Sequence, residues 1–245
     1  MEASLDAGPT PLDLMVFGPI RSVNIFEETL ERVAYTIKSG IYQPGTRLPS
    51  ERELAARLEV SRATLREVNR ALEQAGYVEL RRGRTGGAFV LERPVEASME
   101  QARRVAREMG DQLPAALDYR WAVEPAAAAL AALRADDSGV RQLEECHAEC
   151  MAVSGRAYRG ADVRFHGQVA LLARSPTIAA AVTGIQQELS DLFSVTPVVE
   201  SVLRHSDDQH GAVVSAIKSG DAAASRAAME EHVKGTEAFL RAFLT

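Results

Sequence analysis

Four side chains in the second half of the sequence have the types and spacing that a divalent metal ion requires. Asp162 and His166 are four residues apart in an alanine-rich segment that favours helix, so both would lie on one helical face. His210 and His232 are equidistant from Asp221, and two antiparallel helices joined there would hold both imidazoles at one level. Three imidazoles and one carboxylate suit Zn²⁺, Ni²⁺ or Mn²⁺. Spacing alone still favours the simpler interpretation, in which three separate histidines are each hydrogen-bonded or exposed.

A second group of side chains, at positions 61–66, suits contact with DNA. If Ser61 caps a helix, Arg62 and Thr64 lie in its first turn, the part of a recognition helix that enters the major groove first. Arg62 can pair with a guanine edge through two hydrogen bonds, and Ser61 and Thr64 suit phosphate oxygens. Arg66 follows Arg62 by four residues and points from the same face. The alternative is a solvated arginine face paired with neighbouring glutamates.

The elements around these residues predict a winged helix-turn-helix. A helix begins at Asn24, and a second, short helix begins at Ser50, where Glu53 completes a capping box. The arginine-bearing helix follows almost at once, as in a helix-turn-helix. Residues Tyr77–Leu80 and Ala88–Leu91 then alternate as two strands around a glycine-rich loop.

Beyond residue 94 the sequence turns alanine-rich and predicts an all-helical bundle, so the chain as a whole is mainly α. We divide it into a flexible tail, a DNA-binding domain, a linker and a helical effector-binding and dimerisation domain, at residues 1–21, 22–92, 93–97 and 98–245. Helices are expected near residues 97–109, 112–134, 139–153, 158–173, 177–195, 198–218 and 221–243.

Composition limits the class of protein further. The net charge of −6 argues against a general nucleic-acid coat, although segment 61–84 is locally basic. The longest apolar run, Ala126–Leu133, is far too short for a bilayer span, and no signal peptide is visible at the start of the sequence. Cys146 and Cys150 form no disulfide framework and are expected to be packed thiols. We therefore expect a cytoplasmic protein, associated with the nucleoid when bound to DNA.

Two runs of residues resemble a known family. Residues 44–55 (Pro-Gly-Thr-Arg-Leu-Pro-Ser-Glu-Arg-Glu-Leu-Ala) and 60–68 (Val-Ser-Arg-Ala-Thr-Leu-Arg-Glu-Val) resemble the DNA-binding domain of GntR-type bacterial regulators. The resemblance implies DNA contacts by the arginine of the Pro-Ser-Glu-Arg run, by the start of the recognition helix and by the wing. The matching positions here are Arg52, Ser61, Arg62, Thr64, Arg66, Arg82 and Gly83.

The helical part resembles the FCD effector domain of the FadR subfamily. The resemblance rests on residues 120–125 (Arg-Trp-Ala-Val-Glu-Pro), on residues 162–166 (Asp-Val-Arg-Phe-His) and on the two later histidines. It implies a divalent metal, with zinc favoured over nickel or manganese, bound by Asp162, His166, His210 and His232. Arg120 is the candidate to hold a carboxylate, because a guanidinium fork matches one through two hydrogen bonds. The alternative for Arg120 is an ion pair with Glu124 at the surface.

Together these features predict a ligand-responsive transcription regulator, expected to be a repressor, that senses a small carboxylate through a metal-containing domain. Its expected partners are a palindromic DNA operator and a second copy of the chain, because one recognition helix reads too few base pairs to select a genomic site. The rival function is a metal-dependent hydrolase that uses the Asp/His site, but no separate general base is apparent. We expect no enzyme activity and no membrane partner.

Overall fold

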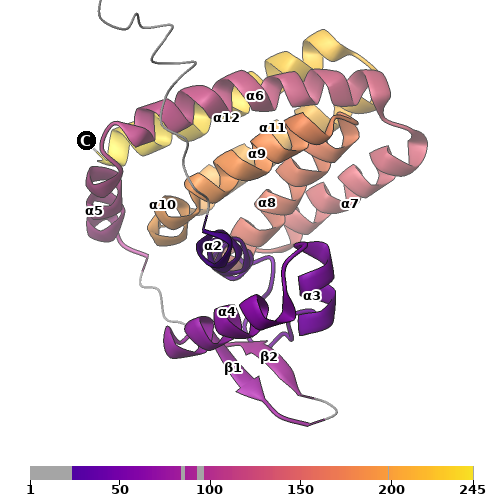
Figure 1. Ribbon diagram of the computed structural model, residues 1–245. Helices are drawn as coiled ribbons and strands as arrows, with labels where there is room; N and C mark the ends of the chain where they lie inside the picture. Colours follow the sequence, from indigo (N-terminus) through magenta and orange to yellow (C-terminus); the bar gives the residue numbers. More distant parts are fainter. Residues whose placement is uncertain (1–23, 84–85, 93–96, 198, 245) are drawn as a thin grey trace, which may run out of the picture.

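The structure is a computed structural model that describes residues 24–83, 86–92, 97–197 and 199–244. A small DNA-binding unit lies beneath a larger helical bundle (Figure 1). The expected tail, residues 1–21, and most of the expected linker, residues 93–97, lie outside the described residues.

Capping side chains begin the helices of the N-terminal unit where the sequence predicts. The Asn24 carboxamide accepts a hydrogen bond from the N–H of Phe26 at 3.1 Å and begins α2. Ser50 and Glu53 form the reciprocal capping box of α3, and the Ser61 hydroxyl accepts from the N–H of Thr64 at 3.0 Å at the start of α4. The three helices are α2 (Ile25–Lys38), α3 (Glu51–Arg57) and α4 (Arg62–Gln74).

A two-stranded antiparallel sheet completes the winged helix-turn-helix. Strands β1 (Val78–Arg81) and β2 (Gly87–Val90) pair in register, with Val78 opposite Val90. The inward side chains of the hairpin join the apolar core of α2 and α4, where Leu65 and Val68 are fully buried. This core holds the recognition helix α4 against the wing.

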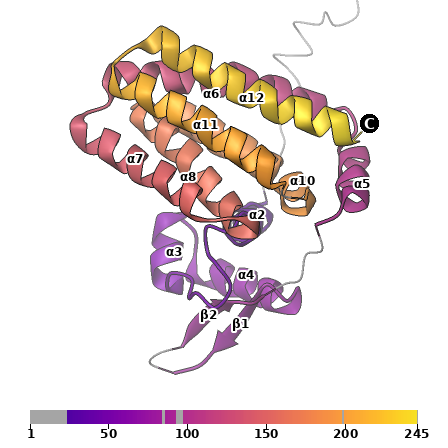
Figure 2. The same cartoon turned by 180° about the vertical axis from the view of Figure 1, so that it is seen from behind.

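The second unit is the predicted helical bundle, and most of its helices lie close to their expected positions. Helix α8 packs against α6, α7 and α9. Helices α11 and α12 form a hairpin on the side of the bundle that faces the viewer in Figure 2. The bounds are α5 (Met99–Met109), α6 (Gln112–Arg134), α7 (Asp137–Ala152), α8 (Gly155–Leu172), α9 (Pro176–Glu188), α10 (Ser190–Val195), α11 (Glu200–Lys218) and α12 (Ala222–Leu244).

One expected helix is divided. The segment expected as a single helix over residues 177–195 is interrupted at Leu189, which separates α9 from α10. The short α10 lies beside α2, and Asp191 there pairs with Lys38 at 2.7 Å (Figure 1). Local pattern does not predict the interruption, because the contact with α2 joins residues far apart in the chain.

No helix in the described part of the chain combines the length and the hydropathy needed to cross a bilayer.

Candidate metal and effector site, and the DNA-reading face

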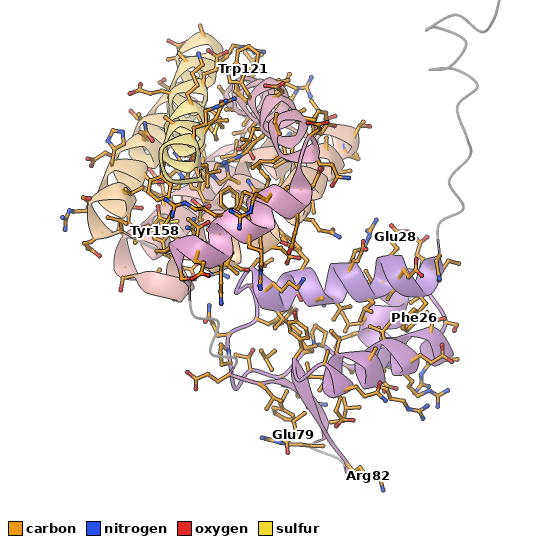
Figure 3. The ribbon with its side chains drawn as sticks, turned by 90° about the vertical axis from the view of Figure 1, so that its left-hand side faces the viewer. Phe26, Glu28, Glu79, Arg82, Trp121 and Tyr158 are labelled. Atoms are coloured by element: carbon orange, nitrogen blue, oxygen red, sulfur yellow. The ribbon has the colours of Figure 1, made fainter. Side chains whose placement is uncertain are left out.

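The predicted DNA contacts lie on or beside α3, α4 and β1 of the N-terminal unit. Arg52 on α3 and Arg62 and Arg66 on α4 are exposed, and no ion pair joins them to an acidic side chain among the described residues. The predicted alternative, an arginine face neutralised by glutamates, is therefore not what the described residues show. Arg82 and Gly83 are exposed at the end of β1, and Figure 3 shows Arg82 at the tip of the wing. The side chain of Thr64 also accepts or donates a hydrogen bond with Ser61 at 2.9 Å, which orders the helix start.

The four predicted metal ligands converge in the bundle. Asp162 and His166 lie one turn apart on α8, while His210 on α11 and His232 on α12 face each other across the helix hairpin. The Nε2 atom of His232 is 3.2 Å from Nε2 of His166 and 3.3 Å from Nε2 of His210. Oδ1 of Asp162 is 3.6 Å from Nε2 of His210 and 3.8 Å from Nε2 of His166. The three histidines are buried, and Asp162 is partly exposed.

These separations fit a divalent metal ion. Bonds of about 2.1 Å to a tetrahedral ion place neighbouring ligand atoms about 3.4 Å apart. The four measured distances lie on both sides of that value. Three nitrogen lone pairs and a carboxylate oxygen turned toward one point would repel each other unless a cation or protons lay between them.

Oxygen atoms behind two of the rings set their orientation. Oε2 of Glu124 lies 2.8 Å from Nδ1 of His166, although off the line of an ideal N–H bond, and Oε1 of Gln209 lies 3.3 Å from Nδ1 of His232. An acceptor on the Nδ1 side favours the tautomer with its proton there, which leaves the Nε2 lone pair free for a metal. No sequence motif pointed to Glu124 or Gln209 in this role.

The electrostatic environment keeps two of the rings neutral. Burial first, and then the neighbouring imidazoles, lower the pKa of His210 and of His232 well below the ordinary value. Burial opposes ionisation of Glu124, but Arg120 and His166 outweigh it and lower the pKa of this carboxyl overall. His210 and His232 therefore present neutral imidazoles at neutral pH, the form that binds metals.

Arg120 does pair with Glu124, but inside the protein and not at its surface. Nε of Arg120 donates to Oε1 of Glu124 at 3.1 Å, and the two side chains are 2% and 1% exposed. Gln186 donates to the same oxygen at 2.7 Å. The Nη1 atom of Arg120 is buried without a hydrogen-bond partner, and the residue lines the cavity beside the metal ligands.

That cavity has about 70 Å³ of room and opens between α8, α10, α11 and α12. Asp162 and His232 lie in its wall, so a molecule inside reaches the metal ligands directly. Arg159 and Phe193 also line it, and sequence reasoning missed both. Arg159 precedes Asp162 by three residues and thus shares its helical face, which is the signal that could have revealed it. His205 also lines the cavity and is exposed.

The two cysteines on α7 are free thiols. Cys150 is buried beside Asp207 and His210, where burial and the nearby carboxylates raise the pKa of its thiol. A thiol kept protonated is a weak metal ligand and a weak nucleophile.

The cavity wall also touches the DNA-binding unit. Tyr35, Lys38 and Ser39 of the N-terminal unit enclose a narrow space together with Arg159 and Asp162 of α8 and Phe193 of α10. Nearby, Gly160 meets the backbone just after α2, since a Cβ at Gly160 would lie 2.7 Å from the carbonyl carbon of Gly40.

The family models and the relatives that match this sequence show that the chain is a DNA-binding transcriptional regulator. Residues 26–90 match the family described as "Bacterial regulatory proteins, gntR family", and residues 115–235 match the "FCD domain". A putative HTH-type transcriptional regulator, RmpR, from Mycobacterium gastri is 32% identical over 190 residues, covering 74% of this chain and 67% of the relative. The protein belongs to the GntR family, and its FCD domain fits the FadR-like subfamily.

Further relatives agree with this assignment. A putative L-lactate dehydrogenase operon regulatory protein from Escherichia coli K12 is 28% identical, covering 89% of this chain and 86% of the relative. The Exu regulon transcriptional regulator of the same organism is 27% identical, covering 88% and 84%. The solved structure of E. coli McbR/YncC shares the fold, with a TM-score of 0.54 at 16% identity, over 90% of this chain and 99% of that one. These relatives are regulators and not enzymes, so the hydrolase alternative has no support.

Proposed function

We propose that this regulator releases or binds its DNA operator in response to a small carboxylic acid, which it senses at a divalent metal held in the FCD domain. The observation that carries the proposal is the meeting of three imidazole Nε2 atoms and one carboxylate oxygen at the wall of a small cavity. We further propose that the protein is cytoplasmic and that its form without the acid represses transcription.

Asp162, His166, His210 and His232 would hold the metal, with zinc favoured over nickel or manganese. A divalent cation there supplies a Lewis acid with coordination positions open to an anionic oxygen. Glu124 and Gln209 would keep two of the rings turned toward it through their Nδ1 atoms.

Arg120 would bind the acid. One edge of its guanidinium is fixed on Glu124, which leaves the buried Nη1 in need of an acceptor at the cavity. A carboxylate supplies that acceptor and gains a charge-assisted hydrogen bond. The relative named for an L-lactate dehydrogenase operon points to the same chemical class, since lactate is a small hydroxy acid.

Helix α10 would pass the signal to the DNA-binding unit. Its Phe193 lines the effector cavity, and Asp191, two residues earlier, pairs with Lys38 at the end of α2. A ligand that moves Phe193 therefore also moves the contact on which the DNA-binding unit rests.

On the DNA side, we propose a homodimer that reads a short palindrome through Arg52, Ser61, Arg62, Thr64, Arg66, Arg82 and Gly83. The outer face of α6 suits the partner copy, because it is apolar and exposed: Tyr119 is 48% and Leu133 is 66% exposed. Between Arg120 and Arg134 the sequence has one charged residue, Glu124, and this residue is buried. Sedimentation of Leu133→Lys tests this face. A variant that stays dimeric would show that the interface lies elsewhere.

The central test measures DNA binding by fluorescence anisotropy on the region upstream of the protein's own gene. The metal-loaded chain should bind this DNA tightly, and a screen of two- to six-carbon acids should contain at least one that changes the affinity. Arg120→Ala should keep the DNA affinity and lose the response, whereas Arg134→Ala, on the same helix but away from the cavity, should keep both. Failure of every acid to act on the wild-type protein would remove the carboxylate proposal.

A further inference from the structure

A second arginine at the cavity has no hydrogen-bond or ion-pair partner for its buried nitrogen among the described residues, and it has no part in the proposed function. Arg159 on α8 is partly buried, its Nε atom is shielded from solvent, and that atom has no hydrogen-bond acceptor. No ion pair joins it to an acidic side chain among the described residues. A guanidinium nitrogen that is buried without an acceptor is costly, since its hydration is lost and nothing replaces it.

The two arginines flank one aromatic ring. The guanidinium carbons of Arg120 and Arg159 lie 5.7 Å and 5.4 Å from the centre of the Phe193 ring. Both residues line the same small cavity, and each has one buried nitrogen without an acceptor. Two like charges brought this close disfavour each other, unless anionic groups lie between or beside them.

With a divalent cation bound, the charges around the cavity leave an excess of positive charge. Its charged lining consists of Arg120, Arg159 and Asp162, together with the exposed His205, while Glu124 lies behind Arg120. Asp207 lies behind Tyr158 in the cavity wall and accepts a hydrogen bond from its hydroxyl, so the two arginines and three carboxylates sum to one negative charge, and a divalent cation on the four ligands would leave one positive charge. The group that still lacks a partner is Arg159, whose Nε atom has no hydrogen-bond acceptor.

We infer that Arg159 binds a second anionic group, so that the effector of this regulator is a small dicarboxylic acid and not a monocarboxylic one. The inference rests on the proposed function: one carboxylate lies at the metal and Arg120, and the other meets the free edge of Arg159. The cavity of about 70 Å³ limits the molecule to a short chain, because one water needs about 10–15 Å³ of the same kind of volume. Phe193 would pack against the carbon skeleton between the two carboxylates.

Pairs of acids that differ by one carboxylate test this inference. Acetate and malonate, propionate and succinate, and lactate and malate are titrated by calorimetry into the zinc-loaded full-length chain, with the shift of the melting temperature as a second measurement. In at least one pair, the diacid should bind the wild-type protein tenfold or more tightly than the monoacid, as one charge-assisted hydrogen bond predicts.

Arg159→Gln should reduce this preference to within about threefold, mainly by weakening the diacid, while zinc content and monoacid affinity stay unchanged. Arg204→Gln, which removes an exposed arginine on α11 outside the cavity, should keep the preference. Equal binding of both members in every pair, or a preference that survives Arg159→Gln, would overturn the inference and leave the carboxylate proposal standing. Absence of binding by every acid would instead overturn both.

Discussion

Replacing Gly160 by alanine should separate DNA binding from effector binding. The added methyl group would lie 2.7 Å from the carbonyl carbon of Gly40 and closer still to its oxygen, whereas an ordinary contact needs 3.4 Å or more, so the two backbones must part by more than about 0.7 Å. No side-chain rotation can relieve this contact, because the Gly40 carbonyl and the Cα that would carry the new methyl group both belong to the main chain. Overpacking of this kind costs about 1–3 kcal/mol, and the gain of an alanine in a helix returns about 1 kcal/mol of it.

The easiest relief is a shift of α2 away from α8, which would also lengthen the 2.7 Å ion pair between Lys38 and Asp191. We therefore expect Gly160→Ala to be destabilised by at most about 2 kcal/mol in urea unfolding. Metal content and acid binding should remain, while the ratio of DNA affinities with and without the active acid should fall toward one. Linkage requires that DNA then lose its effect on acid affinity by the same factor.

Gly167→Ala is the matched control. Gly167 lies on the same helix, and a Cβ there would meet nothing within 4 Å. This variant should be slightly stabilised by its helix propensity and should respond to the acid like the wild-type protein. If Gly160→Ala folds, binds the acid and still changes its DNA affinity by the wild-type factor, the contact between α2 and α8 does not carry the signal.

Three further predictions concern the two ends of the molecule. Arg62→Ala should weaken binding to the operator by about 1–3 kcal/mol and binding to random DNA by less. Arg57→Ala, which removes an exposed arginine on α3, should weaken binding to the operator by less than Arg62→Ala does. Equal losses of affinity for both DNAs in Arg62→Ala would show that Arg62 contacts a phosphate. Elemental analysis should find about one divalent metal per chain, lost in His210→Gln/His232→Gln and kept in His205→Gln. Chelation should therefore lower the melting temperature of the wild-type protein and of His205→Gln, but not that of the double variant. The metal-free protein should lose stability as the pH falls below about 6.5, because His210 and His232 then take up protons in the unfolded chain but not in the folded one. Each histidine should contribute up to about 1.4 kcal/mol per pH unit, which urea unfolding at pH 7.5 and 5.5 measures. If the free energy of unfolding of the double variant changes with pH as much as that of the wild-type protein, other groups cause the loss.

The sequence was most informative where structure is set locally. The capping residues Asn24, Ser50 and Ser61 fix the starts of the first helices, and hydrogen bonds to neighbouring backbone N–H groups confirm them. The convergence of His210 and His232 was also predictable, because a helix hairpin relates residues equidistant from its turn.

What the sequence did not reveal depends on contacts between distant segments. The burial of the Arg120–Glu124 pair follows from helices packed around α6, and the same two residues on an isolated helix would be solvated. The role of Gly160 has no local signal, since a glycine within a helix reads only as a weak helix former. The interruption at Leu189 likewise reflects where α2 lies and not the composition of the segment.

The bare arginines of the reading face also bear on how fast the protein finds DNA. A molecule with a net charge of −6 is repelled as a whole by a polyanion, yet Arg52, Arg62 and Arg66 lie exposed on α3 and α4 without acidic partners among the described residues. These arginines give a local positive potential, so the field of the duplex favours encounters in which they lie toward the DNA. The fraction of encounters that lead to binding is then higher than random orientation would give. The negative charge of the bundle disfavours non-specific binding of the protein along DNA. Raising the salt concentration should slow association much more than it speeds dissociation from the operator.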